Sequence, residues 1–268
     1  MQEAFFLKSA KGGLFCIGTL HADNKVARQS VVIVPPFAEE MNKTRHLLAA
    51  LARQIADVGY DVLLFDFFGT GDSEGDFADS SIATWRSDID TVIQRMNPRV
   101  KLHMVGFRSG ALMAADAASR HDVHSLTLVQ PHLSGKQQLD EILRLRLTAA
   151  LMDGGNREGV SALRNRLMEE GETLEVAGYG LSRDLAIGLD SLVLRGLDTR
   201  TLATINCMEI VSEPAAGTRD GLREAIDDWK AAGMQVNLDN TVCSEFWATR
   251  EIAPCPALVD GIVRRLVN

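Results

Sequence analysis

Glycines at positions 106 and 110 bracket the residues of this chain that could carry out covalent chemistry. The segment reads Gly106-Phe107-Arg108-Ser109-Gly110. This is the spacing of the G-x-S-x-G turn, in which a serine nucleophile lies on a strand-to-helix turn too sharp for larger flanking residues. The nucleophile position here belongs to Arg108, and a guanidinium keeps its proton and has no lone pair with which to attack a carbonyl carbon. The spacing therefore predicts the turn without its usual nucleophile.

Ser109 is the nearest alternative nucleophile, one residue later. At the first turn of a helix, one residue rotates a side chain by about 100°. We therefore expect the hydroxyl to point away from the pocket that the turn faces. Two interpretations stay open: Ser109 satisfies backbone amides at the helix N-terminus, or it acts as a non-standard nucleophile.

The histidines are also in the wrong place for a Ser-His-Asp arrangement on this turn. There the acid and then the histidine follow the serine, with the histidine near the C-terminus. All six histidines lie in the first half of the chain, and the segment after the last predicted strand offers Glu245, Phe246 and Trp247 instead. We expect a degenerate triad. The histidines are His21, His46, His103, His121, His124 and His132.

Short apolar runs set the elements that must position these residues. Residues 31–34, 61–65, 101–105 and 126–129 are apolar and are separated by stretches with helical periodicity, which is typical of buried parallel strands. Residues 206–211 and 235–238 continue the pattern, residues 4–7 and 14–21 predict an opening hairpin, and a last helix is expected at 256–267. The fold class is α/β, with a doubly wound, mostly parallel sheet.

The strand pattern stops between about residues 134 and 194. Helical sequence interrupted by glycines at 154–155 and 178–180 predicts a helical cap inserted into a single domain that spans residues 1–268. The first helix of this cap is amphipathic, and its apolar face either packs on the core or binds a membrane surface or partner protein. That face comprises Leu139, Ile142, Leu143, Leu147 and Leu151.

Composition excludes several classes of function. The 268 residues are 46% hydrophobic with a formal net charge of −8, so a core is readily built and a nucleic-acid surface is not expected. The start of the chain does not resemble a signal peptide, and no run reaches the ~18 apolar residues of a membrane span. We expect a cytoplasmic protein with free thiols, no metal site and no cofactor, because the four cysteines are widely spaced. These are Cys16, Cys207, Cys243 and Cys255.

A second glycine-rich loop supports a family resemblance. Residues 66–75 read DFFGTGDSEG, which resembles the D-x-x-G-x-G-x-S-x-G loop of the α/β-hydrolase superfamily, and the turn at 106–110 follows at the expected distance. Residues 36–43 (PFAEEMNK), 71–77 (GDSEGDF) and 134–137 (SGKQ) are most similar to the exosortase A system-associated hydrolase family, type 2. The resemblance implies an α/β-hydrolase fold over the whole chain, a hydrolase label and a setting beside exopolysaccharide genes.

The resemblance also implies an oxyanion hole. The backbone amides of Phe37 and Ser109 occupy its places, where donors point at developing negative charge. Arg108 would add a planar cation suited to a carboxylate or phosphate. Two interpretations of Arg108 stay open: Glu39 or Glu40 neutralises its charge within the protein, or a ligand contacts it. Both hold if a ligand competes with the glutamate for Arg108.

Three further residues are candidates for the pocket. His132 follows the strand at 126–129, Glu213 stands near the usual place of the triad acid, and Glu245 is close to the missing base. Each is either a pocket residue or an ordinary polar loop residue, and a carboxylate base would need a raised pKa to act near neutral pH.

Two functions follow from these residues. The protein binds a small anionic or acyl ligand in the former active-site pocket, or a partner protein through the cap. Alternatively, it is an active esterase or acyl hydrolase that uses Ser109 or another non-standard nucleophile.

Overall fold

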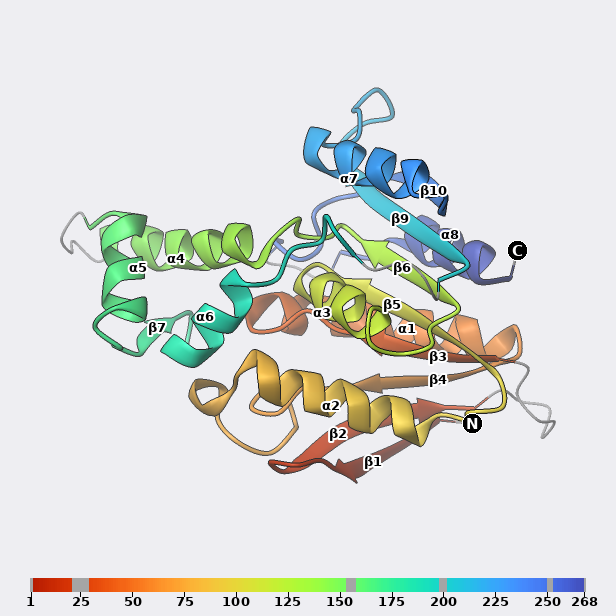
Figure 1. Cartoon of the computed structure of the whole chain (residues 1–268), viewed down its shortest axis with the longest axis horizontal. Coiled ribbons are helices and arrows are strands. Elements are labelled where there is room, and N and C mark those ends of the chain that lie inside the picture. The colour runs from red at the N-terminus through yellow and green to blue at the C-terminus, as the bar shows by residue number, and fades with distance from the viewer. Residues whose placement is uncertain (1, 21–28, 153–157, 198–201, 250–252, 268) are drawn as a thin grey trace.

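An eight-stranded sheet forms the centre of the molecule (Figure 1). The computed structural model describes residues 2–20, 29–152, 158–197, 202–249 and 253–267, without the side chains of residues 151 and 152. The strands lie in the order β1-β2-β4-β3-β5-β6-β9-β10. The opening hairpin β1–β2 is antiparallel and joins β4 antiparallel, whereas every pair from β4 to β10 is parallel. The prediction of a mostly parallel, doubly wound sheet is confirmed.

The predicted strands and helices are present, with small shifts at their ends. The strands are β1 (Gln2–Lys8), β2 (Gly13–Thr19), β3 (Gln29–Val34), β4 (Tyr60–Phe65), β5 (Lys101–Phe107), β6 (Ser125–Val129), β7 (Leu174–Val176), β8 (Tyr179–Leu181), β9 (Thr204–Val211) and β10 (Gln235–Val242). The helices are α1 (Glu39–Asp57), η1 (Phe77–Asp79), α2 (Ile82–Arg95), α3 (Ser109–Ala118), α4 (Gly135–Met152), α5 (Val160–Met168), α6 (Arg183–Asp190), α7 (Asp220–Ala231) and α8 (Pro256–Val267).

Helices cover both faces of the sheet, as its buried strands require. Alternate residues of β3 point to opposite faces: Val31 and Ile33 pack with α1 and α8, while Val32 and Val34 pack with α2, α3 and α7. This alternation follows from the two-residue repeat of a strand. The result is two apolar layers, one on each face, with the turns after β3, β5 and β6 meeting at one edge of the sheet.

The chain leaves the sheet after β6 and returns at β9, and the segment between them forms a lobe at the left of Figure 1. We call residues 134–194 the insertion. Leu139 and Leu143 of α4 are fully buried in the same apolar cluster as α2 and α3. Ile142 and Leu147 are half-buried against that cluster. The amphipathic face of α4 therefore packs inward, while the side chain of Leu151 lies outside the described residues.

The insertion is not purely helical, which corrects the expectation from sequence. β7 and β8 pair antiparallel across a turn at Ala177 and Gly178, which both have positive φ, 49° and 85°. Two such residues form the tight hairpin turn whose twist suits antiparallel strands. The glycines at 178 and 180 therefore belong to a hairpin and do not merely interrupt helices.

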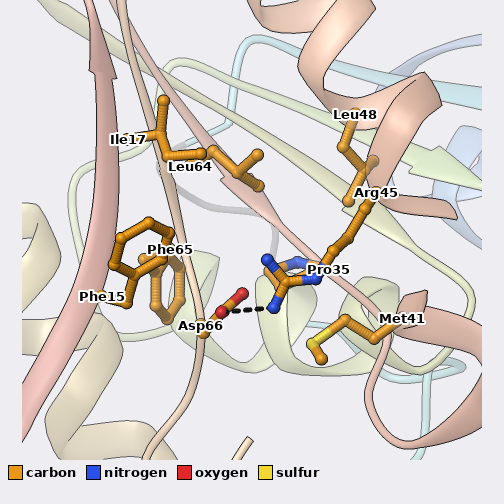
Figure 2. A pocket seen from close by; sticks show the side chains of 9 residues that line it. All are labelled: Phe15, Ile17, Pro35, Met41, Arg45, Leu48, Leu64, Phe65 and Asp66. Atoms are coloured by element: carbon orange, nitrogen blue, oxygen red, sulfur yellow. Dashed lines mark hydrogen bonds and ion pairs between the residues drawn. The ribbon is translucent and has the colours of Figure 1, made fainter. Parts of the chain in front are cut away.

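The glycine-rich loop after β4 is held by a partly buried ion pair. Figure 2 shows Arg45 of α1 pointing at Asp66, with Nη2 2.6 Å from Oδ2. The same carboxylate oxygen accepts the amide of Asp72 at 2.9 Å. The cavity around the pair is only about 10 Å³, no more than one water would fill. This pair is therefore structural, and it ties α1 to the loop.

Among the residues that the structure describes, no helix combines the length and hydropathy that a bilayer span requires. Within the same ranges, no cluster of three or more His, Cys, Asp or Glu side chains is arranged to hold a metal ion.

Candidate functional site

The turn at 106–110 forms as predicted, with Arg108 between β5 and α3. Arg108 has φ 52° and ψ −115°, a strained conformation for a residue with a side chain. A Cβ on Gly106 would lie 2.6 Å from the Cα of Ala111, and one on Gly110 would lie 2.3 Å from the carbonyl oxygen of Pro35. Both glycines are therefore required by the close approach of backbone, as the spacing indicated.

Ser109 is buried and is not among the residues that line the cavity beside Arg108, as expected for a residue one position late. Its side chain is 1% exposed, and its Oγ accepts a hydrogen bond from the amide of Phe37 at 3.3 Å. No histidine or carboxylate in the described ranges hydrogen-bonds to Ser109. The expected oxyanion hole is altered as well, because the Phe37 amide is engaged by this hydroxyl.

The guanidinium of Arg108 is held by two carboxylates and one aromatic ring. Its Nε and Nη2 donate to Glu40 Oε1 at 3.0 and 2.8 Å, and Nη2 also reaches Glu141 Oε2 at 3.4 Å. Its central carbon lies 4.7 Å from the centre of the Trp247 ring, within cation–π range. Of the two glutamates expected to neutralise Arg108, Glu40 makes the contact.

Helix α1 presents Glu40 to this pair from its first turn. Burial raises the pKa of Glu40, and the charge and hydrogen bonds of Arg108 counteract that rise. The carboxylate of Glu141 raises the pKa further. Arg108 is thus the partner that most favours the ionised form of Glu40, since a buried carboxylate without a cation would take up a proton more readily.

His132 lies in the same place, almost completely buried. Its Nδ1 is 3.7 Å from Glu141 Oε2, too far for a hydrogen bond, and has no partner in the described part of the chain. Burial, together with the positive charges of Arg108 and Arg219, lowers the pKa of His132 to about 2. The imidazole is therefore neutral at physiological pH.

These residues line a cavity of about 390 Å³, which we call the Arg108 cavity. The turns after β3, β5 and β6 supply one side of it and α4 supplies another, so it lies at the carboxyl edge of the parallel strands, where ligands of open α/β sheets bind. The charged or polar side chains that line it are Glu39, Glu40, Lys43, Arg108, His132, Gln138, Glu141 and Arg144.

Other candidates from the sequence are placed differently. Glu39 lines the cavity, but it pairs with Lys43 at 3.5 Å, away from Arg108. Glu213 and Glu245 are exposed and do not line the cavity, which corrects the expectation for both. Glu213 begins a turn in which its carbonyl accepts the amide of Ala216. The carbonyl of Glu245 likewise accepts the amide of Ala248, in a turn that buries Phe246 and Trp247.

Several residues that line the cavity are not predicted from the sequence, among them Trp247, Gln138 and Glu141. Trp247, which the sequence places in the segment of the missing base, packs in the apolar cluster of α8 and also covers Arg108. Gln138 and Glu141 come from α4, where only the apolar stripe had been considered. Residues 138, 141, 142 and 145 have helical spacing and form a second face of α4 that mixes polar with apolar side chains. This pattern is the signal in the sequence that marks Gln138 and Glu141.

A doubly wound parallel sheet with this strand–turn–helix and an insertion after β6 defines the α/β-hydrolase fold. Residues 25–164, more than half of the chain, match the family model described as serine aminopeptidase, S33 (Hydrolase_4). The chain belongs to this family of α/β hydrolases. No curated protein was found to be related to it in sequence.

Solved structures resemble the chain over its full length. Est1E from Butyrivibrio proteoclasticus, solved with ferulic acid bound, has a TM-score of 0.71 at 15% identity, covering 98% of each chain. A thermostable carboxyl esterase from Bacillus coagulans, solved with glycerol, has a TM-score of 0.65 at 15% identity, covering 99% of this chain and 98% of the other. XC6422 from Xanthomonas campestris, a serine hydrolase without a lid, has a TM-score of 0.60 at 14% identity, covering 99% and 94%. At these identities the likeness establishes the fold.

Proposed function

We propose that the protein is a non-catalytic member of its family that binds a small anionic or acyl ligand in the Arg108 cavity. One observation carries the proposal: the central residue of the turn is an arginine, engaged by Glu40 and covered by Trp247 where a base would stand. A side chain in this arrangement can bind and orient, but it cannot form an acyl intermediate. The engaged Ser109 hydroxyl supports the same conclusion.

The proposal extends to the role of the insertion, the subgroup of the family, and the location and domain organisation of the protein. The insertion acts as a cap over the Arg108 cavity, because α4 supplies Gln138 and Glu141 to its lining. The motifs at 36–43, 71–77 and 134–137 assign the chain to the exosortase A system-associated group, in an exopolysaccharide setting. We place the protein in the cytoplasm and treat residues 1–268 as one domain.

Labelling with a fluorophosphonate tests the absence of catalysis directly. Such probes react with activated serines, so the wild-type protein should stay unlabelled and should not turn over p-nitrophenyl octanoate above the Arg108→Met variant. Labelling that is present in the wild type and lost in Ser109→Ala would replace this proposal with the esterase alternative. Ser109 would then be the nucleophile despite its orientation.

Calorimetric titration tests the binding half of the proposal. Octanoate and neutral octanoyl compounds cover the anionic and acyl cases, and at least one should bind with saturable heat. Trp247→Leu keeps the site apolar but removes the ring over Arg108, and it should weaken that binding. If neither kind of probe binds at millimolar concentration, the cavity is not an acyl or simple carboxylate site and the proposal fails.

A further inference from the structure

Two residues that line the Arg108 cavity each carry a buried polar atom without a hydrogen-bond partner. Six buried side-chain nitrogen or oxygen atoms of the described residues lack a hydrogen-bond partner. Two of them, Gln138 Oε1 and His132 Nδ1, belong to residues that line this cavity, and both residues are at least 96% buried. A buried polar atom without a partner is costly and calls for an explanation. Each atom itself has less than 1 Å² of exposed surface, so a ligand in the cavity would supply a partner after a side chain of the lining moves aside.

The groups that would bind an anion are mostly occupied. The Phe37 amide donates to Ser109, and Arg108 donates to both Glu40 and Glu141. Two carboxylates therefore surround one guanidinium, and His132 adds no positive charge because it is neutral. An entering carboxylate would compete with both glutamates for this guanidinium, while of the other cations in the lining Lys43 is paired with Glu39 and Arg144 is exposed at the surface. Gln138 Oε1, in contrast, is an acceptor that still needs a donor.

An apolar branch continues from the cavity beneath the hairpin of the insertion. A small cavity of about 30 Å³ shares Ala38, Glu39, Ile142 and Leu145 with the Arg108 cavity and is otherwise lined mainly by apolar residues of η1 and the β7–β8 hairpin. Leu145 stands between the two and is 55% exposed. Covering this surface with an alkyl chain would remove apolar area from water, which is favourable.

We infer that the ligand is a neutral amphipath, with a head group that donates hydrogen bonds and a short apolar tail that lies along Ile142 and Leu145. The inference rests on the proposed binding function and decides between its anionic and acyl forms. A primary amide or a hydroxyl has the required chemistry. A carboxylate, which only accepts hydrogen bonds, does not.

Each hydrogen-bonding atom of such a head has a candidate partner among the lining residues. An N–H or O–H of the head donates to Gln138 Oε1, and the head's own oxygen accepts from the Arg108 Nη1 group, for which no described residue provides an acceptor. A hydroxyl could also bridge the 3.7 Å between His132 Nδ1 and Glu141 Oε2. Glu141 is the group that moves to admit the head, because its contacts with Arg108 and Gln137 are long, 3.4 and 3.3 Å.

Three probes with the same tail separate the chemistries of the head. Octanamide offers N–H donors, methyl octanoate offers only acceptors, and octanoate is an anion. Titration calorimetry on the full-length protein at pH 7.5 should show octanamide binding about ten-fold more tightly than either of the others. This is the difference expected from one or two hydrogen bonds made to otherwise unsatisfied partners.

Substitutions at Gln138 test whether the head group of the ligand donates a hydrogen bond to Gln138 Oε1. Gln138→Leu should reduce octanamide affinity by about ten-fold and leave methyl octanoate unchanged, whereas Gln138→Glu keeps an acceptor and should preserve octanamide binding. Gln54→Leu, the same change at an exposed position of α1, serves as the control and should alter neither. Circular dichroism and melting curves check that each variant is folded, and His132→Phe gives a second, independent test of the head contact.

The outcomes separate the inference from the proposed function. Octanoate binding as tightly as octanamide, or more tightly, overturns the neutral head and leaves the binding function intact. Tight octanamide binding that survives both Gln138→Leu and His132→Phe overturns the assignment of the head contacts. If no probe binds, the proposed function itself fails.

Discussion

Arg108 and Glu40 form a partly buried ion pair in which each side chain needs the other. The side chain of Arg108 is 8% exposed and that of Glu40 is 25% exposed. We predict that Arg108→Met lowers the free energy of unfolding by about 2–3 kcal/mol, because it leaves Glu40 buried without a cation. This is below the ~3–5 kcal/mol typical of fully buried pairs, since Glu40 is partly solvated. Urea denaturation measures the change.

The double variant separates loss of the pair from loss of packing. Glu40→Gln alone should cost less, because Arg108 keeps Glu141 at 3.4 Å. Arg108→Met combined with Glu40→Gln should cost about 1–2 kcal/mol less than the sum of the single changes, since no charge is then stranded. Strict additivity would mean that the contact contributes no coupling and that Arg108 matters only as packed volume.

At the residue scale, part of the site could be predicted from the sequence. Arg108 and Glu40 follow the ends of neighbouring parallel strands, so the glycine frame and the order of elements were enough to bring them together. Gln138 and Glu141 come from the insertion, whose orientation on the sheet is decided by packing such as that of Gly188 against Ile82. No local pattern specifies that packing, so the spacing at 138, 141, 142 and 145 marks a second face of α4 without placing that face at the cavity.

The glycine-rich loop between β4 and η1 is the element that holds α1, and with it Glu40, in place. Gly71 has φ 55°, and a Cβ there would lie 2.1 Å from both Arg45 Nη2 and Asp66 Oδ2. We predict that Gly71→Ala lowers the free energy of unfolding by about 3 kcal/mol or more, because it combines backbone strain with disruption of the ion pair. Urea denaturation of the variant provides the measurement.

Gly59 offers a matched control for this change. It also has a positive φ, 99°, but nothing lies within 4 Å of a Cβ built there. Gly59→Ala should therefore show the backbone strain alone, about 1 kcal/mol. Equal losses in the two variants would show that the Arg45–Asp66 pair adds nothing to the stability of the loop.

Among the elements, the buried strands were the most predictable and the insertion the least. Continuous apolar runs such as Val31–Val34 have no other stable place than the middle of a covered sheet. The three-residue strands β7 and β8 are too short to show a period, and their turn uses Ala177 at positive φ, which sequence patterns do not reveal. Assignment of strands from their hydrophobic period therefore worked for the central sheet and failed for the β7–β8 hairpin.

For the molecule as a whole, two buried histidines make stability depend on pH. Burial is the largest cause that lowers the pKa of His132 to about 2 and that of His103 to about 4, from 6.5 in the unfolded chain. Both contribute stability that is complete above pH 6.5 and is lost as the pH falls, because the unfolded chain then binds protons that the folded protein rejects. Glu40, Asp66 and Asp88 act in the opposite direction, since burial raises their pKa values.

Replacing one histidine isolates its part of this dependence from the opposing carboxyl groups. Between pH 6 and 5 the unfolded chain holds nearly one proton more at His132 than the folded protein does, which corresponds to a slope of about 1–1.4 kcal/mol per pH unit. We predict that the wild type loses about 2 kcal/mol more than His132→Phe between pH 7 and pH 5. Urea denaturation at a series of pH values gives the two curves. Parallel curves would show that His132 takes up its proton at the same pH in the folded protein as in the unfolded chain, so that the lining of the Arg108 cavity gains a positive charge as the pH falls below 6.5.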